Sequence, residues 1–181
     1  MNATRGWTWT PRMSVMAALV VMLAAAPLGA QAQKPTGAAA EVEKTLRATM
    51  DAWATLDPAK AAPFYAKDAG LVFFDLAPLK YAGWSEYEAG TKALFATFAS
   101  VRMTPGPDLT VHPAGNWAWA TSTVKADVTM KDAATPEAAK MSLEARWTTI
   151  LEKRAGTWTI VHEHLSAPIE MPAPAAAPAK H

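Results

Sequence analysis

The sequence contains no cysteine among its 181 residues. This absence excludes disulfides, thiol nucleophiles and cysteine-ligated metal sites, so the fold must be stabilised by its apolar core. The sequence also lacks a glycine-rich phosphate loop, a Gly-x-Ser-x-Gly nucleophile elbow and a zinc signature. These are the motifs of nucleotide-binding proteins, serine hydrolases and zinc enzymes. We therefore predict no cofactor and no bound metal.

A large excess of charge of either sign is also absent, because 17 basic side chains stand against 16 acidic ones. Removal of the N-terminal segment would take away Arg5 and Arg12 and leave 15 basic residues and a net charge near −1. Proteins that bind nucleic acid usually carry a basic stripe. We therefore predict that nucleic acid is not a partner.

One long apolar run is present, and it lies near the N-terminus. Two arginines precede the charge-free residues 13–28, and the small residues Ala30 and Ala32 follow. This order is typical of a secretory signal peptide. We predict a signal peptide over residues 1–32, a periplasmic or secreted protein, and no membrane attachment after cleavage. An uncleaved anchor is the alternative, but the run is short for a bilayer and contains Pro27.

The rest of the chain has the length of one domain with short flanking segments. Residues 33–40 are a predicted flexible lead-in. Residues 169–181 are mostly proline and alanine, which bury too little surface to fold. We therefore predict a disordered tail and place a single domain at residues 41–168.

Helical signals occupy the first part of this domain. Four apolar residues recur at steps of four, four and three, which predicts a helix over residues 38–55. They are Val42, Leu46, Met50 and Trp53. Asp57 followed by Pro58 predicts the start of a short second helix. A capping box at residues 85–88 predicts a third helix over residues 86–99.

Strand signals occupy the second part of the domain. Alternation predicts four long strands, at residues 103–112, 117–130, 141–152 and 158–166. Helices that precede a meander of antiparallel strands indicate an α+β fold. A curved sheet around the first helix would leave a pocket between sheet and helices, the usual geometry of a ligand site.

The last two strands carry a group of polar side chains. Alternation places three of them on one face of the last strand, namely His162, His164 and Ser166. Glu163 lies on the opposite face. If Arg146 of the preceding strand faces the same side as the histidines, a guanidinium, two imidazoles and a hydroxyl border one space. Such a space suits an anion or a proton-transfer substrate.

The order of elements resembles the fold of nuclear transport factor two and ketosteroid isomerase, and the chain is most similar to the SnoaL-like group. The resemblance covers residues 41–168. The motifs that carry it are Arg146-Trp147, Gly156-x-Trp158, His162-x-His164-x-Ser166-x-Pro168, Phe64-Tyr65, Asp68, Phe74-Asp75 and Gly83-Trp84. The ending is also similar to the association domain of calcium/calmodulin-dependent protein kinase. The resemblance implies a cone-shaped, strongly curved antiparallel mixed sheet wrapped around three N-terminal helices, with an internal pocket.

The resemblance implies two alternative functions. The first is a small-molecule-binding or assembly domain that forms a homodimer through the sheet and holds a small acidic or polar ligand at Arg146. The second is a cofactor-free isomerase, hydratase or cyclase with Asp75 or His164 as general base and Tyr65 or Tyr81 as proton donor. The residues that we assign to the ligand besides Arg146 are Tyr65, Trp84, Trp53, His162 and Ser166.

Each of these side chains also has a purely structural interpretation. Arg146 would form an internal ion pair with Glu144, Asp75 or Glu163. Asp75 would cap a turn, and one histidine would be buried and bonded to the backbone while the other lies at a rim. Trp117 and Trp119 share one strand face and predict an oligomer interface, because large exposed aromatic side chains are costly without a partner.

Overall fold

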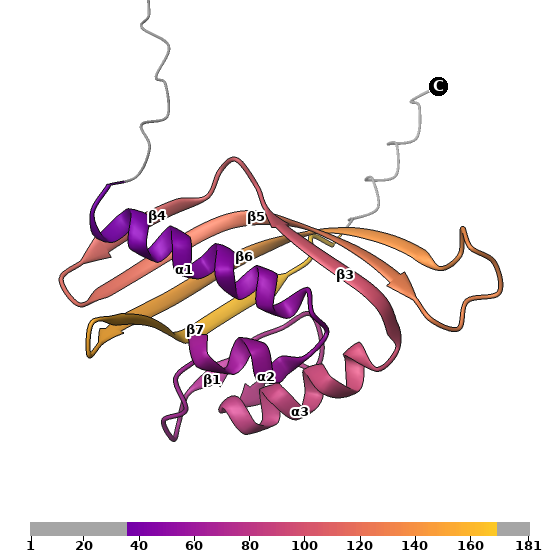
Figure 1. The fold of residues 1–181 in the computed structure, drawn as a ribbon, viewed down its shortest axis with the longest axis horizontal. Helices are drawn as coiled ribbons and strands as arrows, with labels where there is room; N and C mark the ends of the chain where they lie inside the picture. Colours follow the sequence, from indigo (N-terminus) through magenta and orange to yellow (C-terminus); the bar gives the residue numbers. More distant parts are fainter. Residues whose placement is uncertain (1–35, 170–181) are drawn as a thin grey trace, which may run out of the picture. The chain divides into compact units, whose positions relative to one another are not determined.

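The computed structural model describes residues 36–169. Three helices and a five-stranded antiparallel sheet make up this region, which confirms the predicted α+β class (Figure 1). The predicted signal peptide and nearly all of the predicted tail lie outside the described residues. Within residues 36–169, no helix has the length and apolar character needed to cross a membrane.

The first helix, α1, spans Ala38–Trp53 and lies across one face of the sheet (Figure 1). We call this side of the sheet the inner face and the opposite side the outer face. All four residues of the predicted apolar stripe are buried, with at most 4% exposure. The helix starts inside the predicted lead-in, because residues 38–40 are alanines, the residue with the highest helix propensity.

A short helix α2, Pro58–Ala61, and a 3-10 turn η1, Ala62–Phe64, follow α1. The predicted cap is present, since the Asp57 carboxylate accepts the backbone N–H of Ala59 at 3.0 Å. Proline at the first helical position sacrifices no hydrogen bond there. Two short strands, β1 (Val72–Phe73) and β2 (Tyr81–Ala82), then pair with each other.

The third helix, α3, spans Trp84–Phe95 and differs from the prediction at both ends. No side chain of the predicted capping box caps its start. Instead, Glu86 Oε2 accepts the backbone N–H of Ala82 at 2.7 Å. At the other end, the backbone N–H and hydroxyl of Thr97 both donate to the carbonyl of Leu94, which closes the helix.

The sheet contains five strands: β3 (Phe98–Pro105), β4 (Thr110–Ala114), β5 (Trp117–Met130), β6 (Lys140–Arg154) and β7 (Thr157–Ser166). Their order is β3-β5-β6-β7, and β4 pairs with β5 beside β3. The strand predicted at residues 103–112 is therefore two strands. The ladder ends at Pro105 and is interrupted at Gly106 and Pro107, because proline lacks the donor that a strand needs.

A bulge in β7 decides which of its side chains face the helices. Opposite Ile150 and Leu151 of β6 stand His162 and Ile160 of β7, so Val161 has no residue across from it. The extra residue turns Ile160 and Glu163 to the same inner side, where they are 0% and 2% exposed. Strict alternation from Ile160 would have turned His162 inward instead.

Candidate functional site

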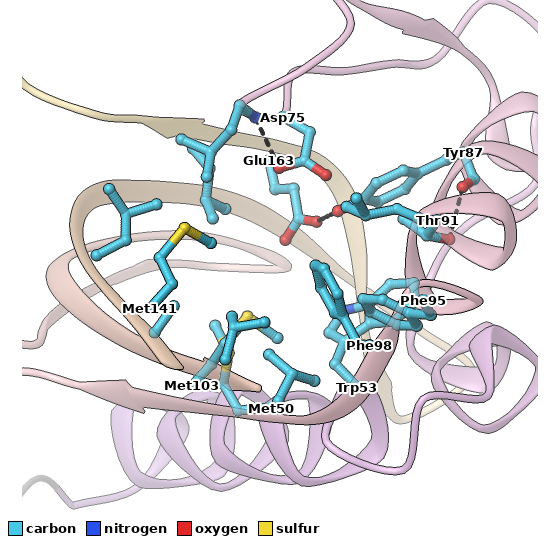
Figure 2. Close-up of a pocket in the computed structure, with 17 residues that line it drawn as sticks. Met50, Trp53, Asp75, Tyr87, Thr91, Phe95, Phe98, Met103, Met141 and Glu163 are labelled. Carbon is cyan, nitrogen blue, oxygen red and sulfur yellow. Dashed lines mark hydrogen bonds between the residues drawn. The ribbon is translucent and has the colours of Figure 1, made fainter. Parts of the chain in front are cut away.

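A cavity of about 120 Å³ lies between α1, α3 and the inner face of the sheet (Figure 2). Most of its lining is apolar and includes Met50, Val101, Met103, Ala126, Val128 and Leu143. Four polar residues also border it, namely Asp75, Tyr87, Thr91 and Glu163. Apolar walls with a few convergent polar groups are typical of ligand sites.

Glu163 is a fully buried carboxyl group at this cavity, held by three aromatic donors. Its Oε1 accepts the hydroxyls of Tyr65, at 2.9 Å, and of Tyr87. Its Oε2 accepts the indole N–H of Trp147 at 3.2 Å. Trp53 on α1 extends the network by donating its indole N–H to the Tyr65 hydroxyl at 2.9 Å. The network therefore joins side chains of α1, α3, β6 and β7, and Figure 2 shows the bond from Tyr87 to Glu163 at the cavity wall.

Burial raises the pKa of Glu163 to about 7, because removal from water disfavours the carboxylate. The three donors act in the opposite direction, and the negative charge of Asp75 adds to the increase. The pKa values of Tyr65 and Tyr87 are raised well above their usual range, by burial first and by the Glu163 charge second. Both tyrosines therefore remain protonated donors, while Glu163 exchanges a proton near neutral pH.

Asp75 is the second carboxyl group at the cavity, and it is half-buried. Burial raises the pKa of Asp75, and a bond from the backbone N–H of Leu76 at 2.7 Å opposes the increase. No ion pair to Asp75 is formed in the described part of the chain. The group therefore has unused acceptor capacity at the cavity wall. Within residues 36–169, no set of three or more His, Asp or Glu side chains is placed to hold a metal ion.

Residues 42–170 match the family described as the SnoaL-like domain. The chain belongs to this family. None of the curated proteins matches the chain, but several solved structures share the fold of this SnoaL-like domain. The family, the fold and the similarity to association domains thus agree with the resemblance found in the sequence.

Three of the solved structures illustrate the range of relatives. One from Xanthomonas campestris, assigned as a calcium/calmodulin-dependent protein kinase II association domain, is 25% identical, with a TM-score of 0.63 over 75% of this chain and 91% of that one. An NTF2-like protein of unknown function from Pseudomonas putida is also 25% identical, with a TM-score of 0.61 over 74% and 89%. A structure from Novosphingobium aromaticivorans, assigned as a scytalone dehydratase, is 12% identical, with a TM-score of 0.62 over 71% and 83%.

Among the predicted site residues of the SnoaL-like domain, Asp75 and Trp53 line the cavity. Tyr65, Tyr81 and Trp84 are buried but do not line it. The Tyr81 hydroxyl donates to a backbone carbonyl at 3.2 Å, and the ring of Trp84 packs at 4.8 Å against that of Tyr65. These three residues therefore belong to the aromatic packing around Glu163 and lie outside the cavity lining.

Arg146 does not lie at the cavity, where the sequence predicts it. Arg146 is exposed on the outer face of the sheet, opposite Ser166 in the β6–β7 register. Its neighbour Trp147 points inward to Glu163, and side chains alternate along a strand. The internal ion pair considered for Arg146 is not formed among the described residues either.

The two histidines also lie away from the cavity. His162 is half-buried, and its Nδ1 lies 2.6 Å from the carbonyl oxygen of Val72, so this nitrogen donates to the backbone. His164 is exposed, and both imidazoles contact the ring of Phe74 edge-on at 5.4 Å between centroids. A general base at His164 inside the cavity is therefore excluded by its position. Together with Ser166, His164 borders an outer groove instead.

The sequence did not identify the network around Glu163. The sequence pattern offers Glu163 only as an ion-pair partner of Arg146, and it does not mark Tyr87 or Trp147 as site residues. One signal was present, since alternation along the strand places Glu163 on the same face as the apolar residues Val161 and Leu165. The bulge at Val161 decides its direction, and no local sequence signal marks that bulge.

Proposed function

We propose that this SnoaL-like domain binds a small, largely apolar molecule in the cavity, with a hydrogen-bond donor of the ligand facing Asp75. The observation that carries the proposal is an apolar cavity with two carboxyl groups in its wall. Glu163 already accepts three protein donors, whereas Asp75 accepts only a backbone N–H. Asp75 is therefore the carboxyl group that is available to a ligand.

Replacing Ala126 by leucine is expected to remove this binding by filling the cavity. Ala126 lies on β5 between Met103 and Leu143, its cross-strand partners, and all three line the cavity. The test is a nuclear magnetic resonance titration with 1-butanol that follows the methyl group of Met103. We expect saturable shifts in the wild-type protein and at least a tenfold weaker response in Ala126→Leu.

The matched control is Thr121→Leu, because Thr121 is exposed on the outer face of the same strand. It adds a side chain of the same kind outside the cavity and should leave the titration unchanged. Equal binding of 1-butanol by the wild-type protein and Ala126→Leu would contradict the proposal.

A cofactor-free isomerase, hydratase or cyclase is the second candidate, and two carboxyl groups with raised pKa values on one cavity favour it. Asp75 would be the base, since it has no competing cation. Structures assigned as dehydratases share the fold, but at 12% and 14% identity this supports the fold alone. The variant Asp75→Asn separates the candidates, because an enzyme would lose turnover while a binding site would keep most of its affinity.

Homodimer formation through the outer face of the sheet is a further part of this proposal. Trp117 and Trp119 are 49% and 47% exposed there, and the ring of His112 stacks on Trp119 at 4.7 Å. Ile150, opposite Trp119 on β6, is 37% exposed. Such a contiguous apolar patch is typical of an interface. The assignment of the Xanthomonas campestris relative as an association domain supports assembly.

The variant Trp119→Glu is expected to convert the dimer to a monomer, because it places a charge in the centre of the patch. Sedimentation velocity at micromolar concentration measures the change. Leu79→Glu is the control, since Leu79 is 89% exposed on a loop that lies outside the patch. A wild-type protein that sediments as a monomer, or a Trp119→Glu variant that stays dimeric, would refute the interface.

Export and the detailed shape of the fold remain predictions. The signal peptide expected at residues 1–32 lies outside the described residues, so a periplasmic or secreted location rests on the sequence. The cone shape and strong curvature of the sheet rest on the resemblance. A cavity between helices and the inner face of the sheet supports that shape.

A further inference from the structure

The cavity is small for a complete ligand. Its volume is about 120 Å³, whereas an engineered apolar cavity of about 150 Å³ holds a single benzene molecule and ligand pockets usually measure about 300–1,000 Å³. A molecule of ordinary metabolite size that enters the cavity must therefore extend beyond it.

An outer groove of about 650 Å³ lies directly beside the cavity. The two spaces share four lining residues, Asp75, Leu76, Leu143 and Leu165. Leu76 is 45% exposed and belongs to the loop that follows β1. The shared wall therefore consists of one carboxyl group and three leucines, one of which lies on a surface loop. A chain of methylene groups could pass this wall with a small displacement of Leu76.

Two polar side chains of β7 border the groove, on either side of Leu165 in the sequence. His164 and Ser166 are two residues apart on the outer face, so their Cα atoms are about 7 Å from each other. His164 is exposed and Ser166 is half-buried. In the part of the chain that the structure describes, neither side chain has a hydrogen-bonding partner, so both are available to a ligand.

Apolar side chains extend along the groove toward solvent. Leu79 is 89% exposed, and it lines the groove together with Phe74 and Pro78. An apolar ligand chain that covers an exposed leucine removes apolar surface from water, which favours binding. The groove therefore combines apolar walls with two hydrogen-bonding groups.

We infer that the cavity and the outer groove form one continuous site for an elongated amphipathic molecule. Its apolar end occupies the cavity, a hydrogen-bond donor along its chain faces Asp75, and its polar end bonds to His164 and Ser166. This inference rests on the proposed function, because it requires that the cavity accept an apolar group. It assigns a role to the groove that the cavity alone does not explain.

The test is a titration with the homologous alcohols 1-butanol, 1-hexanol, 1-octanol and 1-decanol. Burial of each added methylene is worth up to about a fourfold gain in affinity. We expect the affinity to keep increasing from four to at least eight carbons, since the chain continues into the groove. If the affinity stops increasing after four or five carbons, the groove is not part of the site and the inference is overturned.

The double variant His164→Ala/Ser166→Ala tests the polar end. It should lower the affinity for 1-octanol and 1-decanol by about five- to tenfold through the loss of hydrogen bonds. The affinity for 1-butanol should be unchanged. The control is Thr148→Ala, whose side chain shares the outer face but does not line the groove. Equal weakening of all four alcohols, or of none, would overturn the assignment of the polar end.

The outcomes distinguish this inference from the proposed function. If 1-butanol fails to bind the wild-type protein, the proposed function itself is wrong. If 1-butanol binds and the longer alcohols bind no more tightly, the cavity is a binding site that is closed toward the groove. Only the continuous site is then refuted.

Discussion

The variant Glu163→Ala is expected to lower the free energy of unfolding by about 3–5 kcal/mol. Glu163 accepts bonds from Tyr65, Tyr87 and Trp147 in a buried region. Alanine removes both acceptor oxygens and leaves all three donors without their partner, and a buried donor left without a partner costs about 1–3 kcal/mol. Urea denaturation at pH 7 measures the change.

A matched control is Glu144→Ala, since Glu144 is an exposed carboxylate on the neighbouring strand. That variant should change the unfolding free energy by less than about 0.5 kcal/mol. If Glu163→Ala is as stable as this control, the network around Glu163 does not hold the helices to the sheet as we describe.

The second large effect is a loss of stability with rising pH that depends on Glu163. In the folded protein the pKa of Glu163 is about 7, against an ordinary value of 4.5. The folded state thus binds this proton more tightly than the unfolded state does. The stabilisation is complete below pH 4.5, decreases as the pH rises through the folded-state pKa, and is lost above it. The expected total is about 3 kcal/mol.

The measurement compares the unfolding free energies of the wild-type protein and Glu163→Gln between pH 4.5 and pH 8. Glutamine cannot titrate, so the wild-type value should decrease by about 3 kcal/mol relative to the variant across this range. The pKa of Asp75 is also raised, so Asp75 also makes the protein less stable as the pH rises. It is present in both proteins, and its contribution cancels in the comparison. The account is contradicted if the difference in unfolding free energy between the two proteins is independent of pH, or if the wild-type protein becomes relatively more stable as the pH rises. Either result would show that Glu163 is not desolvated.

Elements with a strong periodic pattern could be predicted from the sequence. The apolar stripe of α1 and the alternation of β5 gave correct positions, because each helix or strand buries one face against a continuous core. Cap signals were less reliable. The capping box predicted at residues 85–88 does not form, because the helix begins at Trp84. Glu86 instead accepts the backbone N–H of Ala82.

The site could not be predicted to the same extent, since its residues meet only in three dimensions. Asp75 and Trp53 were placed at the cavity correctly. Arg146 lies outside the cavity, contrary to the prediction, because β6 alternates regularly and turns the neighbouring Trp147 toward the inner face. His164 also lies outside it, because a bulge at Val161 shifts which side chains of β7 face inward. A one-residue shift exchanges the two faces of a strand. Glu163 thereby takes the inward position that strict alternation predicts for the histidines.

The central claim is that the cavity between α1, α3 and the sheet accepts an apolar guest. A crystal structure of the protein under xenon pressure tests it most directly, because xenon enters dry apolar cavities of this size. We predict a xenon atom in contact with Ala126 and Val128, and its loss in Ala126→Leu crystals. An absence of xenon from wild-type crystals, with ordered water bonded to Asp75 and Glu163 filling the cavity instead, would contradict the account.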